Sequence, residues 1–205
     1  EEEIAKRPNM SYKRKPFPLP EGSTPLDESV TMVGASPHPL DPRSTSLAPA
    51  RVVMFMGCRN LLVEDVTMRN QPAGWSYWIC DCDNVHFNRA KIFAAVDMPN
   101  NDGIHINCCR NVTISDCNIS CGDDCIVVRA YSAPMYENKV CEKVCVTNCN
   151  LTSHACAVRL GWINDGVIRN CTFSNLNITE SCTGITMRLP GNPNKLRMSD
   201  QGVED

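Results

Sequence analysis

Five stretches of the sequence repeat one unit, and this repeat limits the possible folds more than any other feature. Each unit is a polar turn followed by alternating apolar positions. The units begin at Cys58, Cys82, Cys109, Cys141 and Asn164. Their turns align on positions separated by 24, 27, 32 and 23 residues: Asn60, Asn84, Asn111, Lys143 and Gly166. A unit this short cannot bury its own apolar side, so it must stack on its neighbours.

The pattern within each unit is typical of strands. Segments such as "NVTIS" and "GVIRNCTFS" alternate with period two and are rich in Val, Ile, Thr and Phe, while a helical period is absent. Scarce leucine and missing helix-forming halves exclude a leucine-rich repeat. The sequence therefore predicts an all-β protein, a right-handed parallel β-helix built as a stack of three-sided coils.

Composition changes along the chain and predicts two regions. Residues 1–50 hold nine of the 14 prolines and no cysteine, which predicts an extended or loop segment. Residues 51–205 carry the coils. The chain stops at "SDQGVED", where another coil begins. An uncapped coil exposes strand edges, so we expect a partial domain whose solenoid is incomplete at one or both ends.

Charge and hydropathy exclude several partners. The chain has 20 Lys and Arg against 23 Asp and Glu, a net charge of -3. This balance argues against a nucleic acid or an anionic membrane as a partner. No apolar run is long enough to span a bilayer, and the first residues lack the apolar stretch of a signal peptide. The oligomeric state is not predicted.

Fourteen cysteines follow the repeat, and we expect most of them to be small buried thiols of a core. Convincing CxxC pairs are missing, so no zinc site is predicted. Free thiols would suit the cytoplasm, whereas a secreted or periplasmic protein would have lost its export signal. Several Asn-x-Ser/Thr triplets are interpreted as turn and ladder residues of the strands, including those at Asn111, Asn150, Asn170 and Asn177.

Three carboxylates are spaced by one coil. Asp102 and Asp124 are 22 residues apart, and Asp123 adjoins the second. The same register stacks two apolar pairs, Ile104 over Ile126 and Ile106 over Val128. Stacked strands lie about 4.8 Å apart. The sequence thus predicts that the three acids converge on one patch.

Glycines explain how the acids leave the strand pattern. Simple alternation would send Asp102 to the side of Ile104, so we place the acids at a bend where Gly103 and Gly122 let the backbone turn. Like charges this close raise at least one pKa. One protonated and one ionised carboxyl group suit general acid/base work, as in inverting glycoside hydrolysis. The alternative is turn chemistry, in which Asp beside Gly is ordinary.

At these residues a resemblance emerges. "PNNDGIHI" and "SCGDDCIVV" resemble the paired motifs N-T-D-G and G-D-D of the polygalacturonase family of pectin-degrading glycoside hydrolases, family 28, over about residues 50–190. The resemblance implies a pectin-lyase-like right-handed solenoid and single-displacement hydrolysis of a galacturonic-acid-containing poly- or oligosaccharide, without a cofactor or a metal. It matches Asp123 to the general acid, and Asp102 and Asp124 to the pair that activates water.

Other positions of the family pattern are altered. Asn101 stands where the family usually has Thr. "SHA" is the nearest counterpart of G-H-G and keeps His154, and "TMR" falls near the R-I-K clamp and keeps Arg188. His154 is predicted to assist the catalytic acids.

Alternation adds candidate substrate-binding residues. It leaves Arg159 and Arg188 outward, where Arg could grip a uronic acid carboxylate at two points. His105 is also outward and is a third candidate. The aromatic residues of "GWSYWIC" form either a sugar-stacking platform or coil packing.

Two rival functions are weighed beside hydrolysis. A pectate-lyase-like enzyme would bind calcium through the clustered Asp side chains, because calcium prefers oxygen ligands. A non-catalytic glycan-binding or structural β-helix is the other rival, since the His and Arg motifs are incomplete. Loss of activity in a chelator would favour the first, and binding without release of reducing ends the second.

Overall fold

A computed structural model describes residues 51–69, 74–96, 100–132, 135, 138–162 and 165–188. Within these ranges every regular element other than isolated turns is a strand. No helix in the described ranges is long and apolar enough to cross a bilayer. The predicted Pro-rich segment, residues 1–50, and the end of the chain from residue 189 lie outside the described residues.

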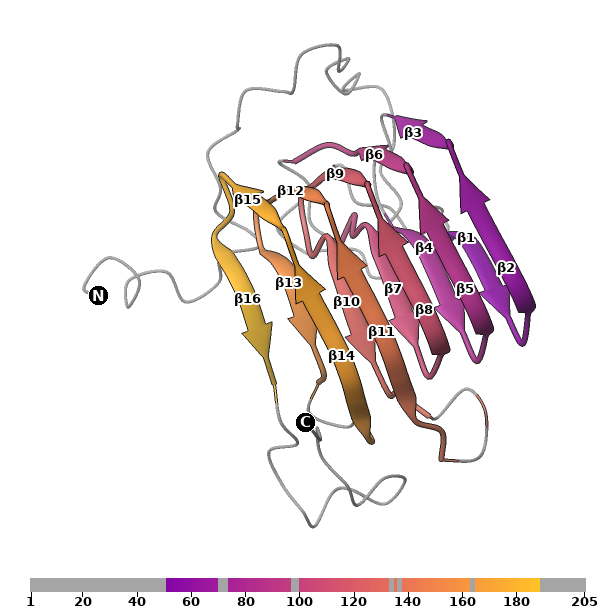
Figure 1. Ribbon diagram of the computed structural model, residues 1–205. Helices are drawn as coiled ribbons and strands as arrows, with labels where there is room; N and C mark the ends of the chain where they lie inside the picture. Colours follow the sequence, from indigo (N-terminus) through magenta and orange to yellow (C-terminus); the bar gives the residue numbers. More distant parts are fainter. Residues whose placement is uncertain are drawn as a thin grey trace.

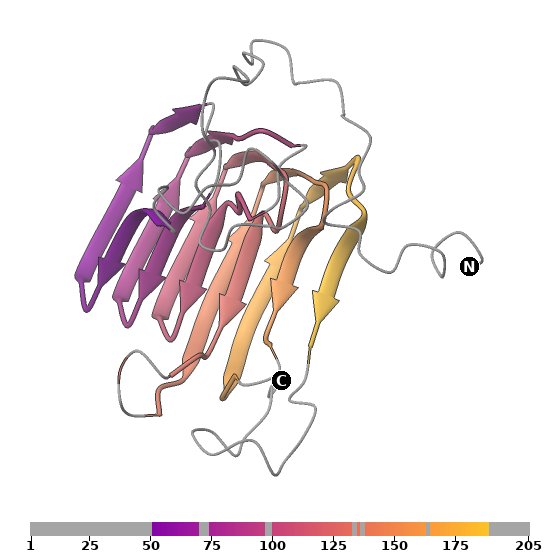
Figure 2. The same cartoon turned by 180° about the vertical axis from the view of Figure 1, so that it is seen from behind.

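Three parallel sheets make up the three sides of the coils, as Figure 1 and, from behind, Figure 2 show. The six-stranded sheet has the order β1 (Arg51–Met56), β4 (Trp75–Cys80), β7 (Ile104–Asn107), β10 (Ile126–Arg129), β13 (Cys156–Leu160) and β16 (Thr183–Met187). The second has the order β14 (Ile168–Ser174), β11 (Cys141–Thr147), β8 (Arg110–Ser115), β5 (Asp83–Asn88) and β2 (Arg59–Glu64). The third has the order β15 (Asn177–Thr179), β12 (Asn150–Ser153), β9 (Asn118–Cys121), β6 (Lys91–Phe93) and β3 (Thr67–Arg69).

Each sheet takes every third strand of the chain, so the chain winds once around the molecule before it pairs with itself. All strand pairings among the described residues are parallel, and the stacking predicted from the sequence is present: Ile126 pairs with Ile104, and Val128 with Ile106. Parallel crossovers are right-handed in nearly all known cases. The predicted all-β class and right-handed parallel β-helix are confirmed.

Each strand of the second sheet has an unusual backbone conformation near its start, just after the turn from the first sheet. One residue per coil has φ between 55° and 59°, the left-handed region that Asn tolerates best. These residues are Asn60, Asn84, Asn111, Lys143 and Asn170. The first four are the predicted turn anchors. The fifth prediction, Gly166, was wrong: Cys141 pairs with Ile168, so the last unit begins four residues after the predicted Asn164. Strand-like residues before the turn, "GVIR", caused the error.

The cysteines fill the core much as predicted. All 14 are free thiols, and ten are buried. Cys145 is an exception, because the left-handed Lys143 interrupts the alternation and leaves Cys145 half-buried while Cys141 is buried. The Asn-x-Ser/Thr triplets are turn and ladder residues, as interpreted: the Asn177 side chain, for example, donates to Asn150 Oδ1 at 3.1 Å.

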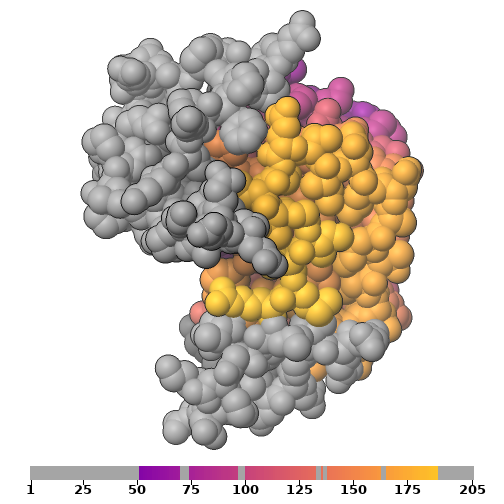
Figure 3. Space-filling model, turned by 90° about the vertical axis from the view of Figure 1, so that its left-hand side faces the viewer, coloured from indigo at the N-terminus to yellow at the C-terminus, as the bar shows by residue number. Residues whose placement is uncertain are grey.

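The last described coil leaves part of the solenoid's inner side uncovered. Ile185 pairs with Val158 and Met187 with Leu160, so both point along the core column. They are 56% and 59% exposed because no further described strand stacks on them. Figure 3 shows this end of the stack, with the strands around Thr183–Met187 in yellow facing the viewer.

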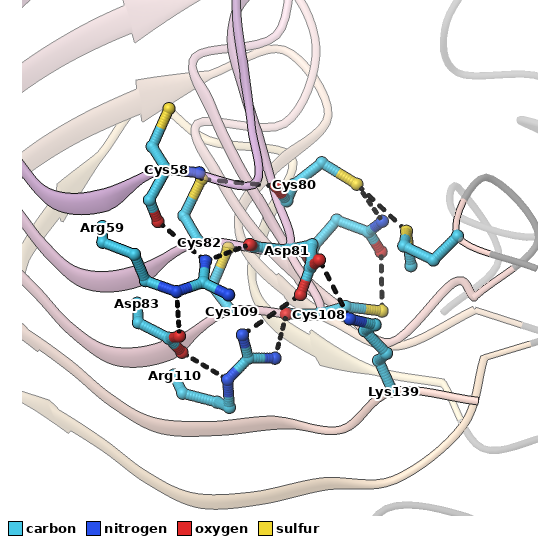
Figure 4. Close-up of polar contacts among 12 residues, drawn as sticks. Cys58, Arg59, Cys80, Asp81, Cys82, Asp83, Cys108, Cys109, Arg110 and Lys139 are labelled. Atoms are coloured by element: carbon cyan, nitrogen blue, oxygen red, sulfur yellow. Dashed lines mark hydrogen bonds and ion pairs between the residues drawn. The ribbon is translucent and has the colours of Figure 1, made fainter. Parts of the chain in front are cut away.

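Ion pairs brace the turns that join the first and second sheets (Figure 4). Arg59 Nε lies 2.7 Å from Asp83, and Arg110 bonds the other oxygen of Asp83. Arg110 Nη2 and Lys139 Nζ also hold Asp81, at 3.1 and 2.9 Å. Burial alone would raise the pKa of Asp81, but the hydrogen bonds from Lys139 and Arg110 outweigh it and hold that pKa below its usual value. This ladder of ion pairs, formed by Asp81 and Asp83 with Arg59, Arg110 and Lys139, therefore stabilises the coils most when Asp81 is ionised.

Asp81→Asn should weaken this ladder. Asn tolerates the left-handed backbone of position 81 (φ 51°), so the change removes the charge and not the turn. A carboxyl group whose pKa is lowered by folding stabilises the folded chain at pH values above its unfolded pKa. This stabilisation is lost as pH falls through the folded pKa. We expect the variant to lose about 1 to 2 kcal/mol of unfolding free energy at pH 7, and none near pH 2, in urea unfolding. Equal stability at pH 7 would show that the ladder contributes nothing.

Candidate active site

Equivalent positions of successive coils form a column of side chains at the site. Arg51 at the start of β1 pairs with Trp75 at the start of β4. The offset of 27 between β4 and β7, seen where Tyr77 pairs with Ile104, places Asp102 next in this column. Gly103 N donates to Asp124 O at 2.9 Å, which places Asp124 after it. The site thus lies at the bends where the chain enters the six-stranded sheet.

The three acids converge as predicted. One carboxylate oxygen from each of Asp102, Asp123 and Asp124 lies within 4.8 Å of the other two. Asp102 and Asp124 are buried, and Asp123 is half-buried. Asp123 is therefore the carboxyl group of the three that solvent, or a bound ligand, reaches most easily.

Gly103 is needed for space and not, as predicted, for backbone freedom. Its φ is not in the left-handed region, but a Cβ at this position would lie 2.3 Å from the carbonyl oxygen of Cys125. The two coils therefore approach more closely here than a side chain allows. Asn101 reinforces the contact, since its Oδ1 accepts from Gly122 N at 2.6 Å and its Nδ2 donates to Ala95 O at 2.5 Å.

Burial changes the acidity of the cluster. It raises the pKa of Asp102 well above the usual value, and the negative charge of Asp123 adds to the rise. It also raises the pKa of Asp124 to about 7, against hydrogen bonds from Arg159 that limit the rise. The predicted upward shift is present, and its largest cause is loss of solvation, with like charge second. Both shifts favour the protonated form of these carboxyl groups more than in an exposed aspartate.

His105 contacts Asp102. It pairs with Trp78 and Val127 in an outward column, as alternation predicted, yet it is buried, and the Trp75 ring stacks on it at 3.6 Å. Its Nε2 lies 2.7 Å from Asp102 Oδ2. Burial lowers the pKa of His105 to about 3, so the ring is neutral at pH 7. A neutral imidazole can donate to or accept from this carboxyl group, which fixes the orientation of Asp102.

The two predicted arginines lie in different surroundings. Arg159 bonds both oxygens of Asp124, one of them through Nη2 at 3.1 Å. Arg188 is exposed at the end of the last described coil. Both guanidinium groups lie over the ring of Trp162, at 4.9 and 5.0 Å from its centroid. Arg159 therefore belongs to the acid cluster, and Arg188 flanks it from the next coil.

The remaining candidates divide between site and core. His154 is buried at the bend after β12, and its backbone N donates to Cys121 O at 3.3 Å, beside the loop that carries Asp123. Tyr77 packs in the core against Phe87. Trp75 and Trp78 are half-buried on the outer face, so Tyr77 serves coil packing, and a sugar-stacking platform stays a prediction for the two tryptophans.

Sequence reasoning missed Arg51 and the role of Asn101. Arg51 lies in the same column as Asp102, two coils earlier. Counting back from Asp102 by the 27-residue and 24-residue steps between coils would have found it. Asn101 was considered only as a replacement for Thr, although an amide can donate and accept at once and so joins two coils.

The sequence matches a known protein family. The family model, described as glycosyl hydrolases family 28, matches residues 43–189. The chain belongs to this family.

This family 28 chain is similar to plant proteins. It is 27% identical to a probable polygalacturonase of Arabidopsis thaliana over 60% of this chain and 32% of that protein. It is 33% identical to a polygalacturonase of Nicotiana tabacum over 59% of this chain and 30% of that protein. A polygalacturonase of Malus domestica is 38% identical over 42% of this chain and 18% of its own length. The chain spans about a third or less of these curated relatives.

The buried acid of this family 28 chain should reduce its stability at high pH. An aspartate in an unfolded chain titrates near 3.9, and the pKa of Asp102 in the folded chain is higher. The free energy of unfolding therefore falls as pH rises from the unfolded pKa through the folded pKa, because the folded chain favours the protonated carboxyl group. Asp102→Asn keeps an acceptor for His105 without a charge. We expect it to melt at a higher temperature than the wild type at pH 8, by a margin that shrinks toward pH 4.

Asp116→Asn is the matched control for the melting experiment, because Asp116 is an exposed aspartate on another side of the solenoid. It should leave the melting temperature nearly unchanged at both pH values. A lower melting temperature for Asp102→Asn than for the wild type at pH 8 would contradict the argument from burial.

Proposed function

We propose that this chain hydrolyses galacturonic-acid-containing pectic polysaccharides or oligosaccharides, with inversion at the anomeric carbon. The observation that carries the proposal is the cluster of Asp102, Asp123 and Asp124, with oxygens within 4.8 Å of one another. The substrate class is supported by the polygalacturonase names of the plant relatives and by the cationic side chains around the cluster.

The burial of the three acids suggests their roles. Asp123 is the most accessible, so it donates the proton to the leaving sugar oxygen. Asp102 and Asp124 lie deeper and hold the attacking water. A water that makes two hydrogen bonds of about 2.8 Å can join oxygens up to roughly 5.6 Å apart, which the cluster accommodates.

The neighbouring residues position these acids. Arg159 bonds both oxygens of Asp124 and so holds this carboxylate in place, and His105 orients Asp102. Carboxyl groups of inverting enzymes are commonly about 6.5 to 9.5 Å apart, whereas about 5 Å is typical of retaining ones. Here two acids share the base function, so a single separation does not describe the site, and the configuration of the product decides the mechanism.

Calcium-dependent elimination is the second candidate, because the same three oxygens are close enough to hold a cation. Arg159 argues against it: a guanidinium already occupies both oxygens of Asp124. A calcium ion would have to compete with this bidentate pair.

Asp123→Asn should lower kcat on polygalacturonate by about 10² to 10⁴, the usual contribution of general acid/base catalysis, while the far-ultraviolet circular dichroism stays unchanged. The first product of the wild type should have inverted configuration by NMR. Excess EDTA should leave the rate unchanged, and Asp116→Asn is again the surface control. Retained configuration, near-normal turnover of Asp123→Asn, or a rate abolished by EDTA would each overturn the proposal.

A further inference from the structure

A cavity of about 140 Å³ opens on the outer face of the six-stranded sheet, next to the acid cluster but outside it. Strands β1, β4, β7 and β10 contribute to it. Its lining combines two guanidinium groups with three aromatic rings and one amide: Arg51, Trp75, Trp78, Asn107, Arg129 and Tyr131. None of these six residues takes part in the chemistry proposed above.

One wall of the cavity is a stack that leads to the cluster. The Arg51 guanidinium lies 3.5 Å from the centroid of the Trp75 ring and 5.1 Å from that of Trp78. Trp75 meets Trp78 edge to face at 6.3 Å, and its other contact is the stacked ring of His105, which bonds Asp102. The wall is therefore rigid and in contact with the catalytic side chains.

The opposite wall is held in place by buried partners. Arg129 binds the buried Asp165 through Nε and Nη2, at 3.1 and 2.7 Å, and these bonds leave the donors of Nη1 out of the pair. Asn107 accepts from Tyr131 N at 2.8 Å and donates to Tyr131 O at 3.0 Å, so it fixes the backbone that carries the tyrosine ring. The cavity is formed before any ligand arrives.

We propose that this cavity binds one uronate unit of the substrate, with the sugar ring against Trp78 and the carboxylate directed to Arg51 and Arg129. The inference rests on the proposed function for the identity of the polymer. Aromatic rings offer sugars a flat apolar surface, and Arg is the side chain best suited to grip a carboxylate with two parallel hydrogen bonds. A methyl ester or a neutral hexose lacks the charge that these two arginines recognise.

The position of the cavity fits the unit beside the scissile bond. Trp75 and Arg51 occupy the same column as Asp102, one coil and two coils before it, respectively. Coils are about 4.8 Å apart, so the cavity is displaced from the acids by roughly 5 to 10 Å along the solenoid. A chain of sugars that lies along the sheet would place its adjacent unit there, on the side of the earlier coils.

Binding in the Asp123→Asn background tests the proposal without cleavage. The probes are trigalacturonate and its fully methyl-esterified form, followed by calorimetry and by tryptophan fluorescence, since two of the chain's three Trp residues line the cavity. Arg51→Met keeps the apolar stem and removes the charge. We expect it to weaken trigalacturonate binding about tenfold or more, to remove the preference for the free acid, and to raise KM in the otherwise wild-type chain with little change in kcat.

Three further variants make the result specific. Arg51→Lys should restore part of the preference for the free acid, because it returns the charge but not the two-point geometry. Trp78→Leu should weaken binding of both probes. Arg89→Met removes an exposed arginine that pairs with Glu64 at the end of β2 and with Asp65 just after it. This variant should bind both probes as before.

The outcomes separate this inference from the proposed function. Equal binding of acid and ester by the Asp123→Asn background, or unchanged binding after both Arg51→Met and Trp78→Leu, overturns the cavity's role even if pectin is hydrolysed. Binding that depends on Arg51 and prefers the acid, in a chain that releases no reducing ends, supports the cavity while the proposed hydrolysis fails.

Discussion

Parallel pairing between successive coils is the interaction on which the rest of the structure depends. Because each strand bonds the strand one coil earlier, equivalent residues stack directly over one another. In the core this stacking buries Ile104 and Ile126 as neighbours. At the strand entrance it forces Asp102 and Asp124 together, although like charges repel. The close contact at Gly103, whose missing Cβ would meet the backbone of Cys125, makes the approach possible.

Such a cluster is electrostatically unfavourable, and the surrounding residues show how the fold accommodates it. Arg159 supplies a cation to Asp124, and burial raises the pKa of Asp102, which reduces the repulsion within the cluster. Turns elsewhere have the opposite arrangement: Asp81 is held ionised by Arg110 and Lys139. The same residue type therefore has a lowered pKa in one turn and a raised pKa in another, according to its solvation and partners.

The sequence was sufficient for those features that follow from periodicity. The coils, the stacking of Ile104 on Ile126 and the convergence of three acids all depend on spacing alone, and all are present. Features that depend on local conformation were harder to predict. Lys143 takes a left-handed turn that mostly Asn adopts in this column, and it sends Cys145 outward. The last anchor was misplaced because strand-like residues precede Asn170.

Side-chain contacts between coils were the least predictable part. Alternation placed His105 and Arg159 on the outer face, but spacing does not reveal that Trp75 would cover the first or that Asp124 would bind the second. No sequence motif marks Arg51, because it was singled out only by its contact with the Trp75 ring in the folded structure. The roles assigned to these residues in catalysis and sugar binding stay predictions.

The central claim is that stacking produces a carboxyl cluster in which burial raises the pKa of Asp102. Carbon-13 NMR of the chain labelled at the aspartate side-chain carboxyl carbons, with Asp102→Asn used to assign the signal, tests it most directly. The account predicts that the Asp102 carboxyl loses its proton only well above the ordinary aspartate pKa of about 3.9. Titration of Asp102 near that ordinary value would contradict it.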